Sequence, residues 1–457
     1  MLIAALRAVA VSALAAANFF AALVAAALWI PQDGPTIRRH VVAAVLEGVF
    51  NKHFSYGPFG DIGAPRQTMD CLLADMMLAP PASRIVEAMS NRYAAPQAGW
   101  NDPRVGPAFD CQALARAIPE LGPGYGDVQW LPYDRYIMAP RIVGRVMLSA
   151  MPYETMLNVL RVASYALIAA IGLLAFYRLS RVNPDPESRL VPAGYLTIAL
   201  CLILLYGVHY FDATLYFATQ DMTNYAFIMI SMLMPLASSS DRRLVLYGAC
   251  YGSLIAIFEI FTGGIPFAVA ILPLLLALGF RGDMRAYFAK LLLLWTSFCI
   301  AVLASFAIKK GFTIAFLGDR ESFLDTLLYR MHGDLPALAE GRERSLSSFF
   351  KLYRHWSNLL AFGSRNIGIG LVAASFGVLI AWTWRTRNAG WSGDRALLIA
   401  CWLGVAALIA WFSVFFSHAI IHPYVMARLF AVPVMAATVL IVIGLVRRRQ
   451  PRVLAEA

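Results

Sequence analysis

Apolar runs of 18 or more residues recur along the whole of this 457-residue chain. Each run is long enough to cross a hydrocarbon core of about 30 Å as a helix. Hydrophobic residues make up 60% of the chain and charged residues only 14%, which excludes a soluble globule, a disordered chain and a coiled coil. Long separated runs also favour helices over a β-barrel, whose strands alternate in short segments. The sequence therefore predicts an all-α polytopic membrane protein.

The apolar runs predict about ten transmembrane helices. They lie at 8–30, 156–178, 190–211, 219–237, 244–262, 265–280, 289–308, 367–384, 396–416 and 424–446. This arrangement gathers the arginines of the short connections on one side, and the opposite turns, 212–218 and 263–264, contain no Lys or Arg. The positive-inside rule then predicts that both termini are cytoplasmic, which agrees with an even number of spans.

Five regions follow from this topology. They are a first transmembrane helix (1–30), an extracytoplasmic loop domain with surface helices (31–155), transmembrane helices 2–7 (156–308), a second extracytoplasmic segment (309–366), and transmembrane helices 8–10 with a basic cytoplasmic tail (367–457). Residues 8–30 have an alternative interpretation as a cleaved secretory signal, because small residues are present at 15–17. Their length favours a retained helix, since a signal core has about 7–15 apolar residues.

The loop domain contains signals for ordered structure. Periodic apolar residues predict a surface helix over 36–50, capped by Thr36, a second helix over 69–79 and a third over about 136–150, with Gly- and Pro-rich loops between about 95 and 132. Cys71 and Cys111 share this domain, whose compartment would oxidise them, so a disulfide is predicted. Two separate buried thiols are the alternative. The sequence contains no CxxC or HxxxC spacing, so a metal site is only weakly supported.

Ionisable residues within or beside the spans are candidate functional residues, because charge is costly in the membrane. Glu259 precedes a helix breaker ending at Pro266 and either lines a cavity or bonds a neighbouring helix. His209, Asp212 and Asp221 are interpreted as an ordinary hydrated turn.

The most specific cluster is near the C-terminus. His418 and His422 are one helical turn apart and Arg428 follows, all at the predicted outer interface. An HxxxH pair without a nearby carboxylate is weak evidence for zinc. Binding a phosphate or a sugar hydroxyl fits better, with Arg428 supplying a bidentate fork; ordinary interfacial histidines are the alternative. Arg141 and Arg145 share one helix face and are predicted to assist in phosphate binding.

The basic second outer segment suits phosphate-bearing ligands or anionic lipid headgroups, or is simply a solvated face. The net charge of +11 is interpreted as membrane topology, so nucleic acid is not a predicted partner. Walker, GxGxxG, GxSxG and HExxH motifs are absent from the sequence, which argues against nucleotide-driven pumping and serine hydrolysis.

This layout resembles the GT-C glycosyltransferases, which transfer a sugar from a polyprenyl phosphate on the outer side of the membrane. Short motifs also resemble a loosely characterised family of bacterial multispan proteins of surface-polysaccharide pathways. The shared motifs are Glu47-Gly48, Asp70, Asp75-Met-Met-Leu78, Tyr133-Asp-Arg135-Tyr136 and His418-Ala-Ile-Ile-His422 with Arg428. The resemblance implies the inner membrane of a bacterium, a polyprenyl-phosphate sugar donor, and a glycan or lipid acceptor. Ile137-Met138 replaces an aromatic-His pair of that family, and Asp33 stands alone where GT-C enzymes carry an acidic pair.

Sugar transfer from a lipid phosphate requires a carboxylate to accept the hydroxyl proton and cations to stabilise the leaving phosphate. We expect Asp70 to be the base and Asp75 to orient it or the acceptor, with Asp33 and Glu259 as possible cavity residues. No cofactor is predicted, and a role for a divalent metal ion is left open. The competing hypothesis is a non-enzymatic transporter or assembly subunit for lipid-linked glycans.

The predicted topology can be tested with reporters. A reporter fused after Arg449 should be cytoplasmic, and one inserted near Gly124 should be external, because an odd number of spans separates the two sites. Alkaline phosphatase and fluorescent-protein fusions measure this directly. Both reporters on the same side would contradict the span count.

Overall fold

The computed structural model describes residues 2–29, 34–50, 63–80, 91–95, 97, 102–105, 109–133, 137, 139–181, 186–208, 214–259, 263–317, 356, 367–388, 390, 392–415, 419 and 426–448. Helices account for most of these residues, and two strands pair as an antiparallel sheet. The elements are α1 (Leu2–Trp29), α2 (Gly34–Leu46), α4 (Gly63–Leu78), β1 (Arg92–Ala94), α6 (Phe109–Arg116), η2 (Pro119–Leu121), β2 (Trp130–Pro132), α7 (Ala139–Ala150), α8 (Tyr153–Arg181), α9 (Pro186–Leu205), α11 (Leu215–Leu233), η3 (Leu236–Ser238), α12 (Asp241–Phe258), α13 (Gly264–Ala277), α14 (Met284–Leu317), α18 (Ile367–Thr386), α19 (Gly393–Val414), η4 (Arg428–Phe430) and α22 (Ala431–Arg448).

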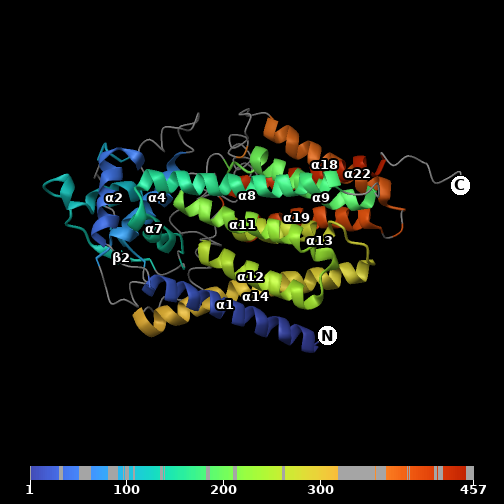
Figure 1. Ribbon diagram of the computed structural model, residues 1–457, viewed down its shortest axis with the longest axis horizontal. Helices are drawn as coiled ribbons and strands as arrows, with labels where there is room; N and C mark the ends of the chain where they lie inside the picture. The colour runs from blue at the N-terminus through green and yellow to red at the C-terminus, as the bar shows by residue number, and fades with distance from the viewer. Residues whose placement is uncertain are drawn as a thin grey trace.

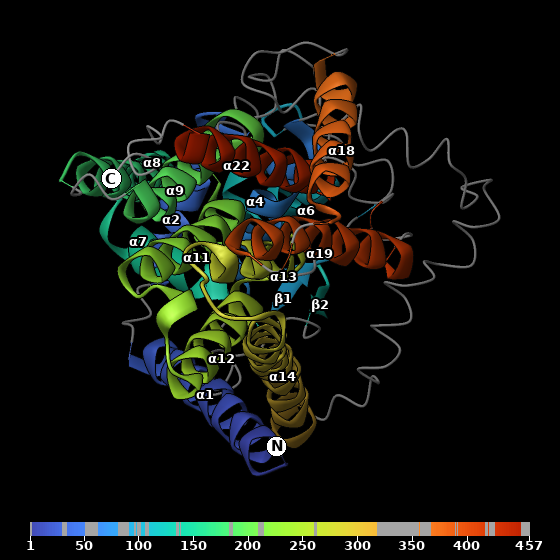
Figure 2. The same ribbon diagram turned by 90° about the vertical axis from the view of Figure 1, so that its right-hand side faces the viewer.

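The long helices run side by side along the longest axis of the molecule, and α2, α4, α7 and β2 gather at one end of them (Figure 1). We call the described elements between residues 34 and 150 the end domain. The start of α1 and the end of α22 lie at the opposite end of the bundle (Figure 1). Seen from that opposite end, α1, α12 and α14 form one side of the bundle, while α9, α13 and α22 lie on the other (Figure 2).

Six helices in the described part of the chain are long and apolar enough to cross a membrane, so the chain is a multi-pass membrane protein. They are Leu6–Trp29, Tyr153–Arg181, Met284–Phe316, Ile367–Thr386, Gly393–Val414 and Arg428–Arg447, and two shorter apolar helices are Arg189–Leu205 and Gly264–Ala277. Each of the ten predicted spans overlaps a helix among the described residues, but only six of these helices are long and apolar enough to cross a membrane. The largest boundary difference is at α14, which continues to Leu317, whereas the sequence placed its end at 308. Apolar residues continue past Lys309 and Lys310, which favours a longer helix. Lysine side chains are long enough to place their charged ends near the membrane interface.

Cationic side chains join the helices at the end of the bundle away from the end domain. Arg178 of α8 donates to the backbone oxygen of Met232 at 2.7 Å, and Lys290 of α14 donates to that of Ala237 at 2.8 Å. Arg447 of α22 forms an ion pair with Asp394 of α19. We call this the basic end, because the helix termini there also carry Arg181, Arg189, Arg242, Arg243, Arg281, Arg285, Arg385, Arg387, Arg395 and Arg448.

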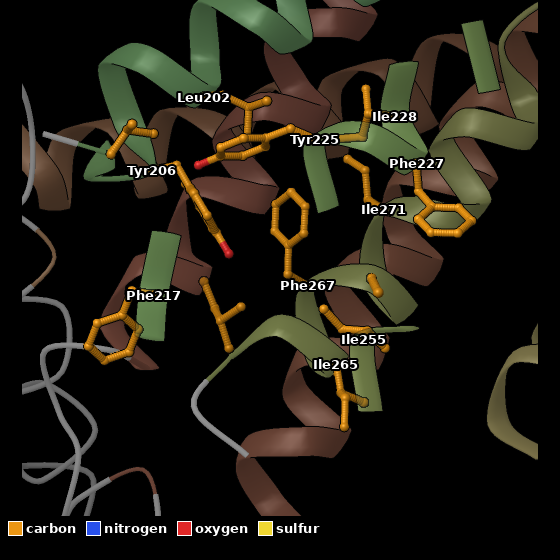
Figure 3. Packing of buried hydrophobic residues seen from close by; sticks show 14 of the residues in the cluster. Leu202, Tyr206, Phe217, Tyr225, Phe227, Ile228, Ile255, Ile265, Phe267 and Ile271 are labelled. Carbon is orange, nitrogen blue, oxygen red and sulfur yellow. The ribbon is translucent and has the colours of Figure 1, made fainter. Parts of the chain in front are cut away.

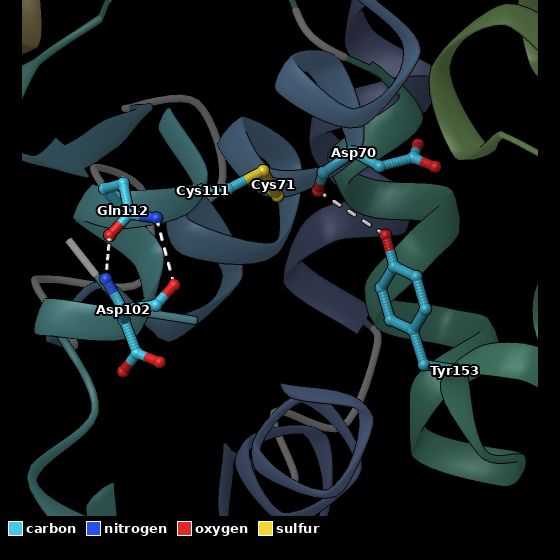
Figure 4. The surroundings of a disulfide bond; sticks show 6 residues. All are labelled: Asp70, Cys71, Asp102, Cys111, Gln112 and Tyr153. Carbon is cyan, nitrogen blue, oxygen red and sulfur yellow. Dashed lines mark hydrogen bonds between the residues drawn. A yellow bond between two sulfur atoms is a disulfide. The ribbon is translucent and has the colours of Figure 1, made fainter. Parts of the chain in front are cut away.

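The end domain contains the predicted disulfide. Cys71 of α4 and Cys111 of α6 are bonded, with their Cα atoms 4.9 Å apart (Figure 4). The sequence predicted loops where α6 and β2 lie, so that expectation was wrong. The helix has only eight residues, too few to produce a clear periodic signal. The predicted start of the first surface helix was also late, since α2 begins at Gly34 and includes Thr36.

Two glycines allow α12 to lie directly against the backbone of α14. A Cβ atom at Gly248 would lie 2.6 Å from the backbone oxygen of Leu294, and one at Gly252 would collide with that of Phe298. Between them, the Tyr251 ring packs edge-on against Phe298, with centroids 5.3 Å apart. This Gly-x-x-x-Gly spacing is typical of membrane helices that pack closely through small residues.

Gly252→Leu should destabilise the protein by about 1–3 kcal/mol, because the added side chain must separate α12 from α14. Unfolding of the purified protein in mixed detergent micelles measures the loss. Gly377→Leu is the matched control, since no atom lies within 4 Å of a Cβ placed at that helical glycine. Equal stability losses in the two variants would contradict the close α12–α14 contact.

Candidate functional site

The predicted base, Asp70, holds the start of a membrane-bundle helix. Its Oδ1 accepts a hydrogen bond of 2.9 Å from the backbone N–H of Leu215, the first residue of α11. A carboxylate at a helix N-terminus is favourable, because it meets unpaired N–H groups and the positive end of the helix dipole. The Tyr153 hydroxyl donates to the backbone oxygen of Asp70 at 3.4 Å (Figure 4). Asp70 therefore joins the end domain to both α8 and α11.

Asp75 has a different partner in the end domain. Its Oδ2 accepts a hydrogen bond of 2.6 Å from the backbone N–H of Ala94 in β1. Within the described residues, its Oδ1 is buried without a hydrogen-bond partner. Burial raises the pKa of Asp75 well above its usual range, the Ala94 N–H opposes this, and the negative charge of Asp110 adds to the increase. Burial thus favours the protonated form of Asp75, and its hydrogen-bond partner in β1 differs from the partner of Asp70 in α11.

A buried ion pair lies further along α11. The Nη1 atom of Arg428 donates to the Oδ2 atom of Asp221 at 2.8 Å. The Arg428 side chain is 0% exposed and that of Asp221 only 4%. The interpretation of Asp221 as part of a hydrated turn was therefore wrong: it lies inside α11 and faces the beginning of α22. An ion pair in so dry a place is held by strong Coulomb attraction and by hydrogen bonding.

Aromatic rings surround this pair. The Arg428 guanidinium carbon lies 4.7 Å from the ring centroid of Tyr206 and 5.7 Å from that of Phe217, which are cation–π distances. The Tyr225 hydroxyl points toward Tyr206, and the Phe267 ring packs beside the Tyr206 ring with centroids 4.6 Å apart (Figure 3). In the described part of the structure, the hydroxyl groups of both tyrosines and the Oδ1 atom of Asp221 are buried and have no hydrogen-bond partner.

Glu259 lies beside the same cluster. It follows the last residue of α12, and its Oε2 accepts a hydrogen bond of 2.7 Å from the backbone N–H of Gly264, where α13 begins. The helix break predicted at this place is present. A Cβ atom at Gly264 would collide with the Glu259 carboxylate and lie 2.6 Å from the Nε2 atom of Gln220, so a side chain there would displace both groups. Of the two interpretations of Glu259, the bond to a neighbouring helix is the one that this geometry supports. Asp221, Glu259 and Arg428 are all within electrostatic range of Tyr206.

Arg141 and Arg145 are buried on α7 in the end domain. Between them, Ile142 belongs to the same apolar cluster as Ile257 of α12, two residues before Glu259. The helix that carries the two arginines therefore borders the end of α12 at which the polar cluster lies.

Three predicted site residues, Asp33, His418 and His422, lie outside the described residues. The sequence reasoning missed Tyr206, Tyr225 and the role of Asp221. Asp221 could have been found, because it falls inside the predicted span 219–237, where an acidic residue requires a partner. Nothing in the sequence indicated a functional role for the two tyrosines, because aromatic side chains in membrane helices usually serve in packing.

The arrangement brings one fixed cation, two nearby carboxyl groups and two hydroxyl donors to the end of the bundle that meets the end domain. Such a set can bind an oxyanion through a guanidinium and hydroxyl groups. Among the residues that the structure describes, no three His, Cys, Asp or Glu side chains are grouped so as to hold a metal ion.

No family model, curated protein or solved structure matches this chain. The function proposed below is therefore supported by the residues and their geometry alone.

The acidic residues of the end domain predict a pH dependence. Burial raises the pKa of Asp110 to about 6, so the folded protein binds a proton that the unfolded chain releases near pH 4. The stabilisation from this proton is complete below pH 4 and is lost as the pH rises toward 6. Asp110→Asn should therefore increase stability at pH 7 and flatten the profile between pH 4 and 7.

Thermal unfolding of the purified protein across this pH range measures the effect. Asp127→Asn is the matched control, because Asp127 is exposed in the same domain. An unchanged slope in the Asp110→Asn protein would show that Asp110 titrates as an ordinary surface acid.

Proposed function

We propose that this chain is a membrane glycosyltransferase of the GT-C type. It takes a sugar from a polyprenyl-phosphate donor and transfers it to a glycan or lipid acceptor on the extracytoplasmic side of a bacterial inner membrane. The proposal includes ten transmembrane helices, two cytoplasmic termini and an extracytoplasmic domain formed by residues 31–155.

The distribution of charge along the bundle supports this orientation. Arginines and Lys290 occupy the basic end, where α1 starts and α22 ends (Figure 1). Positive charge in short connections favours the cytoplasmic side. The end domain lies at the other end of the bundle, so the polar cluster beside it faces the compartment in which the Cys71–Cys111 disulfide forms.

The observation that carries the proposal is the Arg428–Asp221 pair beside two tyrosine hydroxyls that have no hydrogen-bond partner among the described residues. A lipid phosphate at the outer interface needs a cation and hydroxyl donors at the depth of its headgroup, and this cluster supplies both. Because Arg428 is fully buried, a headgroup reaches it only if side chains packed around it move. Asp221 acts as a positioning residue that fixes the guanidinium.

The acid–base roles follow from the two carboxyl groups of α4. Asp75 accepts a hydrogen bond from the backbone N–H of Ala94, and burial raises its pKa, which favours the protonated form. Asp70 remains the proposed base. Its bond to Leu215 uses one carboxylate oxygen, and Asn at this position would preserve an acceptor for that N–H group while removing the basic carboxylate.

A transporter or assembly subunit for lipid-linked glycans is the second candidate. Asp221, Arg428 and Glu259 are ionisable groups buried in the bundle, and such groups also occur along substrate pathways of transporters. Asp70→Asn distinguishes the classes. Loss of product with retained folding favours the enzyme, whereas retained synthesis with lost translocation of the lipid-linked glycan favours the transporter.

Arg428→Lys should weaken binding of undecaprenyl phosphate by about tenfold or more. A lysine keeps the charge but cannot make the planar two-point contact, and a hydrogen bond to a charged group contributes about 1.5–3 kcal/mol. Titration of the purified protein with this lipid phosphate measures the affinity. Arg178→Lys is the control, because Arg178 is partly buried at the basic end and donates to a backbone oxygen.

A charge swap separates binding from folding. The double variant Asp221→Arg with Arg428→Asp retains an ion pair, so it should restore folding relative to either single change. It should not restore lipid-phosphate binding, because the cation has moved from η4 to α11. Normal binding in the swapped protein, or near-normal binding in Arg428→Lys, would remove Arg428 from the site.

A further inference from the structure

A cavity of about 150 Å³ opens at the basic end of the bundle, far from the polar cluster. Four helices form it: the start of α9, the end of α13, the start of α19 and the end of α22. Its volume corresponds to roughly five water molecules, on the basis of about 30 Å³ each. This is enough for a phosphate group and its nearest linking atoms.

The lining of this cavity contains both cationic and apolar side chains. Arg281 and Arg447 supply the guanidinium groups, while Leu190, Leu397 and Ile443 supply apolar walls. Arg447 forms an ion pair with Asp394, yet its Nε atom is buried without a hydrogen-bond partner among the described residues. Arg447 also lines the cavity, so its guanidinium group borders the space that a ligand would occupy.

The backbone around the cavity leaves this space open. Gly279 has a φ of 80°, and a Cβ atom there would lie 2.7 Å from the Val191 side chain. A Cβ atom at Gly393 would lie 3.2 Å from the Nη2 atom of Arg447. Gly393 begins α19, so the positive end of a 22-residue helix also faces this region and favours an anion there.

The outer surface beside the cavity suits acyl chains. Ile441 and Leu445 of α22 are both exposed, and they lie one turn apart on the same helix face. Their neighbour Arg447 lines the cavity. A ligand with an anionic head and hydrocarbon tails would thus find its two parts matched within a short distance.

We propose that this cavity binds the phosphodiester headgroup of an anionic glycerophospholipid from the adjoining membrane leaflet. Arg281 and Arg447 hold the phosphate, and the acyl chains lie along α22. Basic pockets between membrane helices on the cytoplasmic side are suited to anionic lipid headgroups. The site is independent of the proposed donor site, because it lies at the opposite end of the bundle.

The test uses the delipidated full-length protein in a non-ionic detergent. Phosphatidylglycerol is titrated while bound lipid is counted by native mass spectrometry and thermal unfolding is followed. We expect phosphatidylglycerol to bind and to raise the melting temperature, whereas phosphatidylethanolamine and inorganic phosphate do not. Stabilisation by inorganic phosphate equal to that by phosphatidylglycerol would overturn the lipid assignment, leaving a simple anion site.

Two variants identify the cavity. Arg281→Gln should weaken phosphatidylglycerol binding by about tenfold, and thermal unfolding of the lipid-free variant checks that this substitution of an exposed side chain leaves the fold intact. The double variant Arg447→Gln with Asp394→Asn should do the same without leaving an unpaired charge. Arg243→Gln, an exposed arginine of α12 at the same end, should bind normally. Equal losses in all three proteins, or no loss in Arg281→Gln, would overturn the proposal.

Discussion

The ion pair between Arg428 and Asp221 determines how the helices meet beneath the end domain. An arginine that is fully buried among rings is tolerated only if its charge is matched, and removing one partner of a buried pair costs about 3–5 kcal/mol. The pair joins α11 to the start of α22, and Tyr206 brings the end of α9 against the same guanidinium. Well-packed apolar residues often replace such pairs without loss of stability. Stability alone is therefore a weak explanation for a buried arginine at position 428. The proposed anion binding explains specifically why the residue is an arginine.

Polar groups can gather at this depth because neighbouring positions are small. Gly264 leaves room for the Glu259 carboxylate and the Gln220 amide, both of which a side chain would displace. Elsewhere in the bundle, Gly252 of α12 and Gly404 of α19 allow helices to approach a neighbouring backbone. Without a hydrophobic driving force between helices in lipid, such close contacts supply much of the association energy. Glycine thus has two roles here: it allows the helices to pack closely, and it leaves space for the polar cluster.

The positions of the helices were predictable, because a chain in lipid must satisfy its backbone within each helix and this produces long apolar runs. The disulfide was predictable from its compartment. The partner of Arg428 was not, since Asp221 is 207 residues away and no local pattern joins them. The short helix α6 was missed because eight residues between Gly- and Pro-rich stretches carry little periodic signal. Whether Asp70 takes part in catalysis stays a prediction, and its bond to α11 was invisible in the sequence because it is a tertiary contact.

The end domain and the polar cluster are connected through α11. Cys71 fixes α4 to α6, and the adjacent Asp70 holds the first N–H group of α11. Six residues later, about 9 Å along the helix, Asp221 orients Arg428. A displacement of α4 therefore moves the start of α11 and, through it, the position of the guanidinium. Asp70 is required for this geometry whether or not it accepts a proton, so its structural and catalytic contributions are separable only by a substitution that keeps the hydrogen bond to Leu215.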